Sequence, residues 1–123
     1  MRHEVTDADT AESVGSGDVP VLATPRLIAW LEAATVRAAA PFITAGRTTV
    51  GTAIRVRHLR ATRVGGCVEV AAEAPVAAVG RRLTFLVRAV DGTGELVASG
   101  EIDRAIVDRQ RFLAAAPGPQ AGA

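Results

Sequence analysis

Aromatic residues are scarce in this chain of 123 residues, which has three phenylalanines, one tryptophan and no tyrosine. The apolar share is nevertheless 49%, so the core must be built from alanine, valine, leucine and isoleucine, which bury less area each than aromatic side chains do. A domain of this length buries only about two thirds of its unfolded surface. We therefore expect a single domain that gains stability by associating with a second copy.

Lysine is absent, and the 14 arginines nearly balance the 13 acidic residues, which leaves a formal net charge of +1. A nucleic-acid-binding protein would carry a strong basic excess, so the composition argues against that class. The arginines are scattered along the chain, and their planar guanidinium groups suit phosphate and carboxylate. One or two of them are therefore candidates for contact with an anionic ligand.

Cysteine, histidine and long apolar runs are also in short supply. Cys67 is the only cysteine, which excludes an internal disulfide and fits a reducing compartment. No stretch approaches the ~18 apolar residues of a membrane span, and the first residues contain no apolar signal region. The chain has no phosphate-binding glycine loop, nucleophile elbow or metal-ligand spacing. The sequence favours a cytoplasmic protein with no cofactor, metal or membrane contact.

One helix is predicted early in the chain. Thr24 is a good N-cap and Pro25 favours the first helical turn, so the helix is expected to begin there. Apolar residues recur at every third or fourth position to about Ala40, and Pro41 stops the pattern. One helix face is unusually smooth, which lets another element approach closely; its residues are Ala29, Ala33, Ala34 and Ala38.

The period then changes to two, which predicts strands. Short turns separate four of them, at 48–61, 67–79, 83–90 and 95–108. One helix followed by four antiparallel strands is typical of an α+β hot-dog fold, in which a curled antiparallel sheet wraps one long helix. Pairing of two copies would close the open sheet edges.

The ends of the chain are expected to contribute little to this domain, which we assign to residues 1–113. Residues 1–18 are predicted to be a poorly ordered start with at most one short strand, near 4–9. Residues 114–123 are rich in proline and glycine and are predicted to form a disordered tail.

Two titratable side chains are not explained by packing alone. Glu32 has no arginine three or four residues away on the helix, so it either points to water or is kept for chemistry. His58 lies on the apolar side of its strand by the period of two. A histidine there is either structural or able to move a proton.

Two further positions each have a structural and a functional interpretation. Thr24 is explained by capping, but a helix N-terminus also favours an anion such as a carboxylate or an oxyanion. Gly51 opens the long strand without a side chain, which indicates a bulge or a ligand close to the backbone. Arg81 and Arg82 lie in a turn, where they are either solvated or in contact with a phosphate.

Four motifs stand in register along the chain: TPRLIAWLE at 24–32, VGT at 50–52, HLRAT at 58–62 and GRRLTF at 80–85. Together they resemble the hot-dog thioesterases similar to fluoroacetyl-CoA thioesterase. The resemblance covers most of the chain, from about Val19 to Phe112. It is specific, because the family's catalytic threonine, glutamate and histidine have the same spacings as Thr24, Glu32 and His58, eight and twenty-six residues.

The resemblance implies an acyl-CoA thioesterase that hydrolyses a small acyl thioester to the free acid and CoA. It implies that Thr24, Glu32 and His58 are catalytic and that the Gly51 backbone contacts the substrate. The phosphates of CoA, here a substrate and not a cofactor, would bind arginines; the candidates are Arg47, Arg81, Arg82 and Arg104. The alternative is a non-catalytic acyl-CoA or acyl-carrier binding module on the same fold. A hot-dog hydratase would need an Asp/His pair that the sequence does not show.

Two departures from the family pattern qualify this expectation. Ile102 stands in the segment GEIDR, at a position where the family commonly has a histidine, and this is the best argument for the binding module. No aromatic residue precedes Trp30, whereas the fluoroacetyl-specific enzyme covers its site with aromatics from that segment. An acyl group other than fluoroacetyl is therefore expected.

The mechanism expected from these residues requires two chains. Glu32 is predicted to act as base or nucleophile, His58 to move protons, and Thr24 with the Gly51 backbone to position the acyl group; whether Glu32 or Thr24 attacks stays open. Thr24 and Glu32 are about 12 Å apart along one helix, at ~1.5 Å per residue. A second copy is thus predicted to supply at least one of the three, which places the site at a homodimer interface.

Overall fold

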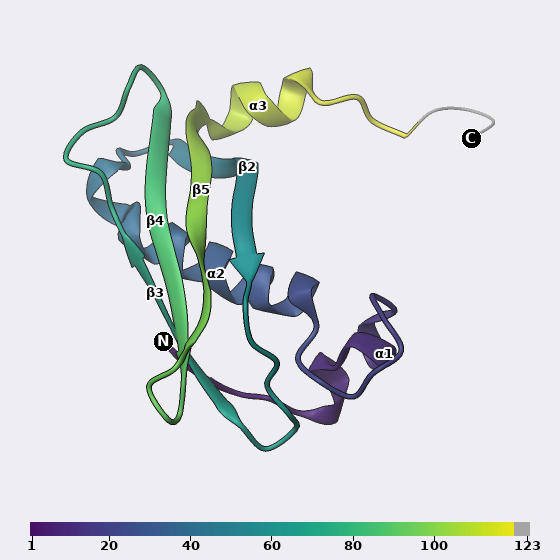
Figure 1. The fold of residues 1–123 in the computed structure, drawn as a ribbon. Coiled ribbons are helices and arrows are strands. Elements are labelled where there is room, and N and C mark those ends of the chain that lie inside the picture. The colour runs from purple at the N-terminus through teal and green to yellow at the C-terminus, as the bar shows by residue number, and fades with distance from the viewer. Residues whose placement is uncertain (120–123) are drawn as a thin grey trace.

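The computed structural model describes residues 1–119, in which a five-stranded antiparallel sheet wraps one long helix (Figure 1). The predicted α+β hot-dog fold is confirmed. No helix in the described part is long and apolar enough to cross a membrane. The strands are β1 (Arg2–Glu4), β2 (Arg47–His58), β3 (Cys67–Glu73), β4 (Arg82–Asp91) and β5 (Leu96–Asp108), and the helices are α1 (Ala11–Val14), α2 (Thr24–Ala38) and α3 (Arg109–Ala115).

The sheet has the spatial order β1-β3-β4-β5-β2, with α2 packed across its inner face. On β4, every second side chain is buried against the helix, as the period of two predicts; these are Leu83, Phe85, Val87 and Ala89. Leu27 and Leu31 face them from α2 and are fully buried. The core is therefore mainly aliphatic, as the shortage of aromatic residues requires.

The elements end earlier than predicted where hydrogen-bond partners run out. β2 ends at His58 and not at residue 61, because β5 begins at Leu96 and offers little beyond the bond from the Leu59 N–H to the Val97 carbonyl, 2.7 Å. β3 ends at Glu73 and not at residue 79, since Pro75 has no N–H for the ladder.

The first eighteen residues contain regular structure, so the prediction of a poorly ordered start is wrong. β1 pairs with Cys67–Glu69 of β3, earlier in the chain than the predicted strand near 4–9. Residues 7–9 form a 3-10 turn, and Thr10 then caps α1 by accepting a hydrogen bond from the Ser13 N–H. The bonds that hold this segment are mostly between main-chain atoms, which apolar periodicity does not report.

The predicted tail at 114–123 begins too early, because α3 extends to Ala115. Residues 116–119 have no regular structure, and residues 120–123 lie outside the described residues. α3 projects from the end of β5 beyond the sheet, and none of its side chains is buried (Figure 1).

β2 is an edge strand. β5 pairs with one side of its 12 residues, and among residues 1–119 no strand pairs with the other side. Ile54 on this strand is 40% exposed, and Val36 on the outer side of α2 is 52% exposed. The chain thus leaves apolar side chains uncovered on β2 and α2.

Candidate active site

The side chains of Thr24 and His58 meet where α2 begins and β2 ends. Thr24 is the first residue of α2 and His58 is the last residue of β2. The Thr24 Oγ1 and His58 Nδ1 atoms are 2.7 Å apart, which is a short hydrogen bond. Thr24 is exposed and His58 is half-buried, so solvent can reach the hydroxyl.

The prediction that Thr24 caps the helix is wrong by one residue. Ala23 occupies the N-cap position and makes no side-chain capping hydrogen bond. Thr24 lies inside the first turn, where its hydroxyl is not engaged in capping. The hydroxyl is therefore available for the hydrogen bond with His58.

The environment of His58 favours the neutral imidazole. Burial lowers the pKa of His58 below its usual 6.5, and the main chain of Arg60 opposes this effect only in part. The Nε2 atom is buried and makes no side-chain hydrogen bond in the described part of the chain. With its proton on Nε2, the ring accepts the Thr24 hydroxyl hydrogen at Nδ1. A histidine in this position can activate a hydroxyl nucleophile.

Glu32 is paired with Arg104, a residue that the sequence suggested only as a phosphate contact. The Glu32 Oε2 and Arg104 Nη1 atoms are 3.3 Å apart. Arg104 is also anchored to Thr49, since its Nε donates to the hydroxyl at 2.9 Å and its Nη2 to the carbonyl at 3.1 Å. The Arg104 side chain is 8% exposed, whereas that of Glu32 is 37% exposed. A fixed guanidinium therefore holds a carboxylate that is open to solvent.

The sequence pattern around Arg104 indicates that its side chain lies on the inner face of the sheet. Ile102, Arg104 and Ile106 occupy alternate positions of β5 and share one face. Ile102 is fully buried and Ile106 packs against the core, so a charge between them must be paired or hydrogen-bonded. Arg104 is thus a positioning residue for Glu32 and not a free cation for a phosphate.

Gly51 lies opposite Arg104 in the β2–β5 pairing, at a β-bulge before Ala53. This confirms the bulge. A Cβ atom at position 51 would lie 2.6 Å from Glu32 Oε2 and 3.5 Å from Arg104 Nη1. The missing side chain therefore makes room for the Glu32 carboxylate against the β2 backbone.

The predicted catalytic residues form two groups within one chain. Thr24 and His58 make one group, and Glu32 with Gly51 and Arg104 makes the other. Thr24 and Glu32 are separated by two turns of α2, about 12 Å at ~1.5 Å per residue. In the described residues, the Glu32 carboxylate has Arg104 as its only ion-pair partner. One chain therefore does not bring the three residues together.

The remaining candidate residues belong to neither of these two groups. Arg81 and Arg82 are exposed at the start of β4, and Arg81 lines a groove at the end of β5. Ile102 is fully buried and pairs with Phe85 and Ile54 in the sheet, so its side chain belongs to the core. Within residues 1–119, no group of three or more histidine, cysteine or acidic side chains is placed to hold a metal ion.

Comparison with known proteins gives a consistent result. The family of fluoroacetyl-CoA-specific thioesterases matches residues 5–110. A fluoroacetyl-CoA thioesterase of Streptantibioticus cattleyicolor is 42% identical over 94 residues, which are 76% of this chain and 66% of that protein. The chain thus spans just under two thirds of this curated relative.

Solved structures agree in fold. A structure of the fluoroacetyl-CoA thioesterase superposes with a TM-score of 0.84 at 33% identity, over 95% of this chain and 93% of that one. A thioesterase superfamily member of Thermus thermophilus has a TM-score of 0.84 at 27% identity, over 93% of this chain and 83% of that one. The chain belongs to the fluoroacetyl-CoA-specific thioesterase family of hot-dog thioester hydrolases.

Proposed function

We propose that this protein hydrolyses a small acyl-CoA thioester to the free acid and CoA. The observation that carries the proposal is the 2.7 Å hydrogen bond between the exposed Thr24 hydroxyl and His58, whose lowered pKa favours the free base. Family membership supports the same chemistry, and variants of the fluoroacetyl-CoA thioesterase have been solved with fluoroacetate and CoA and with acetyl-CoA.

Of the two candidate nucleophiles, the geometry favours Thr24. Its oxygen attacks the thioester carbonyl carbon while His58 Nδ1 accepts the hydroxyl proton. The tetrahedral intermediate then expels the CoA thiolate, which takes the proton back from His58. In the second half of the reaction water attacks the acyl-threonine ester and gives up a proton. The bond between the acyl carbon and the Thr24 oxygen then breaks, that oxygen takes the proton, and the free acid is released. Because Arg104 fixes the Glu32 carboxylate without burying it, we assign Glu32 to orienting and deprotonating that water.

The reaction requires a homodimer in this proposal, because one chain keeps Glu32 away from Thr24 and His58. The edge of β2 supplies unpaired main-chain groups over 12 residues, and a second β2 strand would pair with them. The exposed side chains of Ile54 and Val36 would be covered in the same association. The two-fold axis that relates the two β2 strands creates two equivalent sites.

The acyl group is proposed to be small but not specifically fluoroacetyl. Trp30 is the first aromatic residue of the chain, so no aromatic side chain from the segment before α2 covers the site. Apart from Arg60, the residues that line the groove beside Thr24 and His58 are small or aliphatic, among them Gly17, Val19 and Val21. A site lined in this way discriminates between small acyl groups only weakly.

We place the reaction in the cytoplasm, where the single cysteine would stay reduced.

A non-catalytic binding module is not favoured by the structure. Its main argument was the replacement of the family's histidine by Ile102, yet the Ile102 side chain is fully buried in the core beside Phe85. The replacement therefore changes packing and leaves the Thr24–His58 pair intact.

The proposal is tested by measuring thiol release from a panel of acetyl, propionyl, branched, aromatic and fluoroacetyl CoA thioesters. We expect hydrolysis of several short acyl groups, with kcat/KM for acetyl-CoA and fluoroacetyl-CoA within about tenfold of each other. Tight binding of acyl-CoA without thiol release would support the binding module instead. A preference for fluoroacetyl of a thousandfold or more would contradict the proposed selectivity.

Gly51→Ala is expected to lower kcat about tenfold or more while the protein stays folded, since the new methyl group displaces the Glu32 carboxylate. The matched control is Gly92→Ala, because a Cβ there meets no atom within 4 Å. Both variants would be compared by thiol release and by Tm. An unchanged kcat in Gly51→Ala would show that the position of the carboxylate is not critical.

A further inference from the structure

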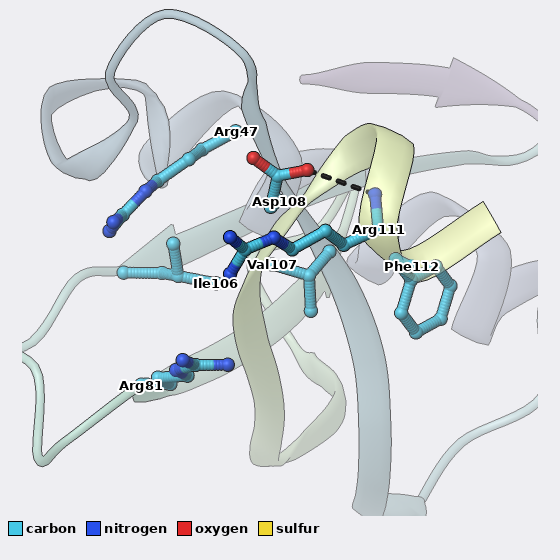
Figure 2. Close-up of a pocket in the computed structure, with 7 residues that line it drawn as sticks. All are labelled: Arg47, Arg81, Ile106, Val107, Asp108, Arg111 and Phe112. Atoms are coloured by element: carbon cyan, nitrogen blue, oxygen red, sulfur yellow. Dashed lines mark hydrogen bonds between the residues drawn. The ribbon is translucent and has the colours of Figure 1, made fainter. Parts of the chain in front are cut away.

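A groove of about 420 Å³ lies where β2 begins and β5 ends, beside α3. Arg47, Arg81 and Arg111 line it, together with Ile106, Val107, Asp108 and Phe112 (Figure 2). Neither the catalytic pair nor the Glu32 group includes any of these side chains. Phe112 is 44% exposed, in a chain that has only four phenylalanine and tryptophan residues.

The groove has an excess of unpaired positive charge. None of the three arginines forms an ion pair within residues 1–119. The only acidic side chain that lines the groove is that of Asp108. Its Oδ1 atom accepts a hydrogen bond from the main-chain N–H of Arg111 at 2.9 Å, which caps α3 and leaves the Arg111 guanidinium unpaired. Figure 2 shows the Arg111 side chain extending from α3 back over the end of β5. Three guanidinium groups against one carboxylate form a site suited to a multiply charged anion.

The position of the groove matches the reach of the substrate. Arg47 and Asp108 pair with each other, four residues beyond the pair formed by Gly51 and Arg104. At ~3.3 Å per residue, the groove therefore begins about 13 Å along the strands from the Glu32 carboxylate, which in the proposed homodimer lies beside Thr24 and His58 of the second copy. The pantetheine arm, which joins the thioester of an acyl-CoA to its nucleotide, contains two amide units. Its extended length is similar to that of a few residues of extended chain, and it therefore matches this separation.

We propose that this groove, defined by Arg47, Arg81, Arg111 and Phe112, binds the nucleotide end of CoA. The arginines contact the 3′-phosphate and the pyrophosphate, and Phe112 stacks on the adenine ring. This inference rests on the proposed thioesterase function and adds to it the recognition of CoA through a site remote from the reacting carbonyl. The proposal also assigns a function to α3, none of whose side chains is buried.

Binding is measured by calorimetry with adenosine 3′,5′-bisphosphate, which lacks a thioester and therefore reports on the groove even if the protein does not hydrolyse acyl-CoA. We expect the wild type to bind the probe and the double variant Arg47→Ala/Arg111→Ala to bind it at least tenfold more weakly. The matched control is Arg88→Ala, an exposed arginine on β4 outside the groove. Loss of binding in this control as well would overturn the proposal, since net charge alone would explain it.

Two further arms identify the ligand. Inorganic phosphate at the same concentration should not displace the probe; if it does so equally well, the groove is a simple anion site and the nucleotide assignment is wrong. In kinetics, the double variant should raise KM about tenfold for acyl-CoA and no more than about twofold for the matching acyl-pantetheine. Equal changes for both substrates, or wild-type binding of the probe by the double variant, would overturn the proposal.

Discussion

His58→Ala is expected to lower kcat for acyl-CoA hydrolysis by about a thousandfold, because it removes the base bonded to the Thr24 hydroxyl. His58→Gln provides a second test, since glutamine can accept the same hydrogen bond but cannot take up the proton at neutral pH. Both variants should keep the far-UV circular dichroism of the wild type. Wild-type rates in both would show that His58 is structural.

His58→Gln is also expected to remove the loss of hydrolytic activity at acidic pH. Since burial lowers the pKa of His58 below 6.5, the wild-type enzyme should lose activity only as the pH falls through that lower value and the imidazole becomes protonated. The matched control is His3→Ala. His3 stacks on Trp30 with ring centroids 4.3 Å apart, and burial lowers the pKa of His3 too, yet it contacts no proposed catalytic group. A profile whose acidic limb survives in His58→Gln would assign that limb to another group.

The fold could be predicted because it depends on repetitive patterns. The period of α2 and the alternation on β4 follow from which face each element buries, and the structure confirms both. The N-terminal segment was missed for the opposite reason. Residues 1–18 are held by main-chain pairing with β3 and by the capping of α1 by Thr10, neither of which leaves an apolar period.

The site could be predicted only in part. The spacing of Thr24, Glu32 and His58 makes them candidates, but it does not show which of them touch. The contact of Thr24 with His58 depends on where the edge strand ends beside the helix, and that is decided by the length of β5. The alternation on β5 places the Arg104 side chain on the face of Ile102 and Ile106, but it does not show which carboxylate that side chain meets, because Glu32 lies 72 positions earlier in the chain.

Glu32→Gln is expected to lower kcat for acyl-CoA hydrolysis by at least a hundredfold, because the amide keeps the size of the side chain but cannot act as a base. It also leaves Arg104, which is 8% exposed, with a neutral partner, so the Tm should fall somewhat. Glu12→Gln on the exposed surface of α1 is the matched control and should change neither value. Full activity in Glu32→Gln would remove Glu32 from the mechanism.

Mixing two inactive variants tests whether each site is shared between chains. Thr24→Ala lacks the proposed nucleophile and Glu32→Gln lacks the proposed base, so each homodimer should be inactive. If Thr24 and His58 of one chain work with the Glu32 of its partner, a heterodimer contains one intact site and one doubly defective site. Random exchange makes half of the dimers mixed, so about a quarter of the wild-type activity should return. If all three residues of a site came from one chain, no mixture would recover activity, and a fully active monomer would equally contradict the shared site.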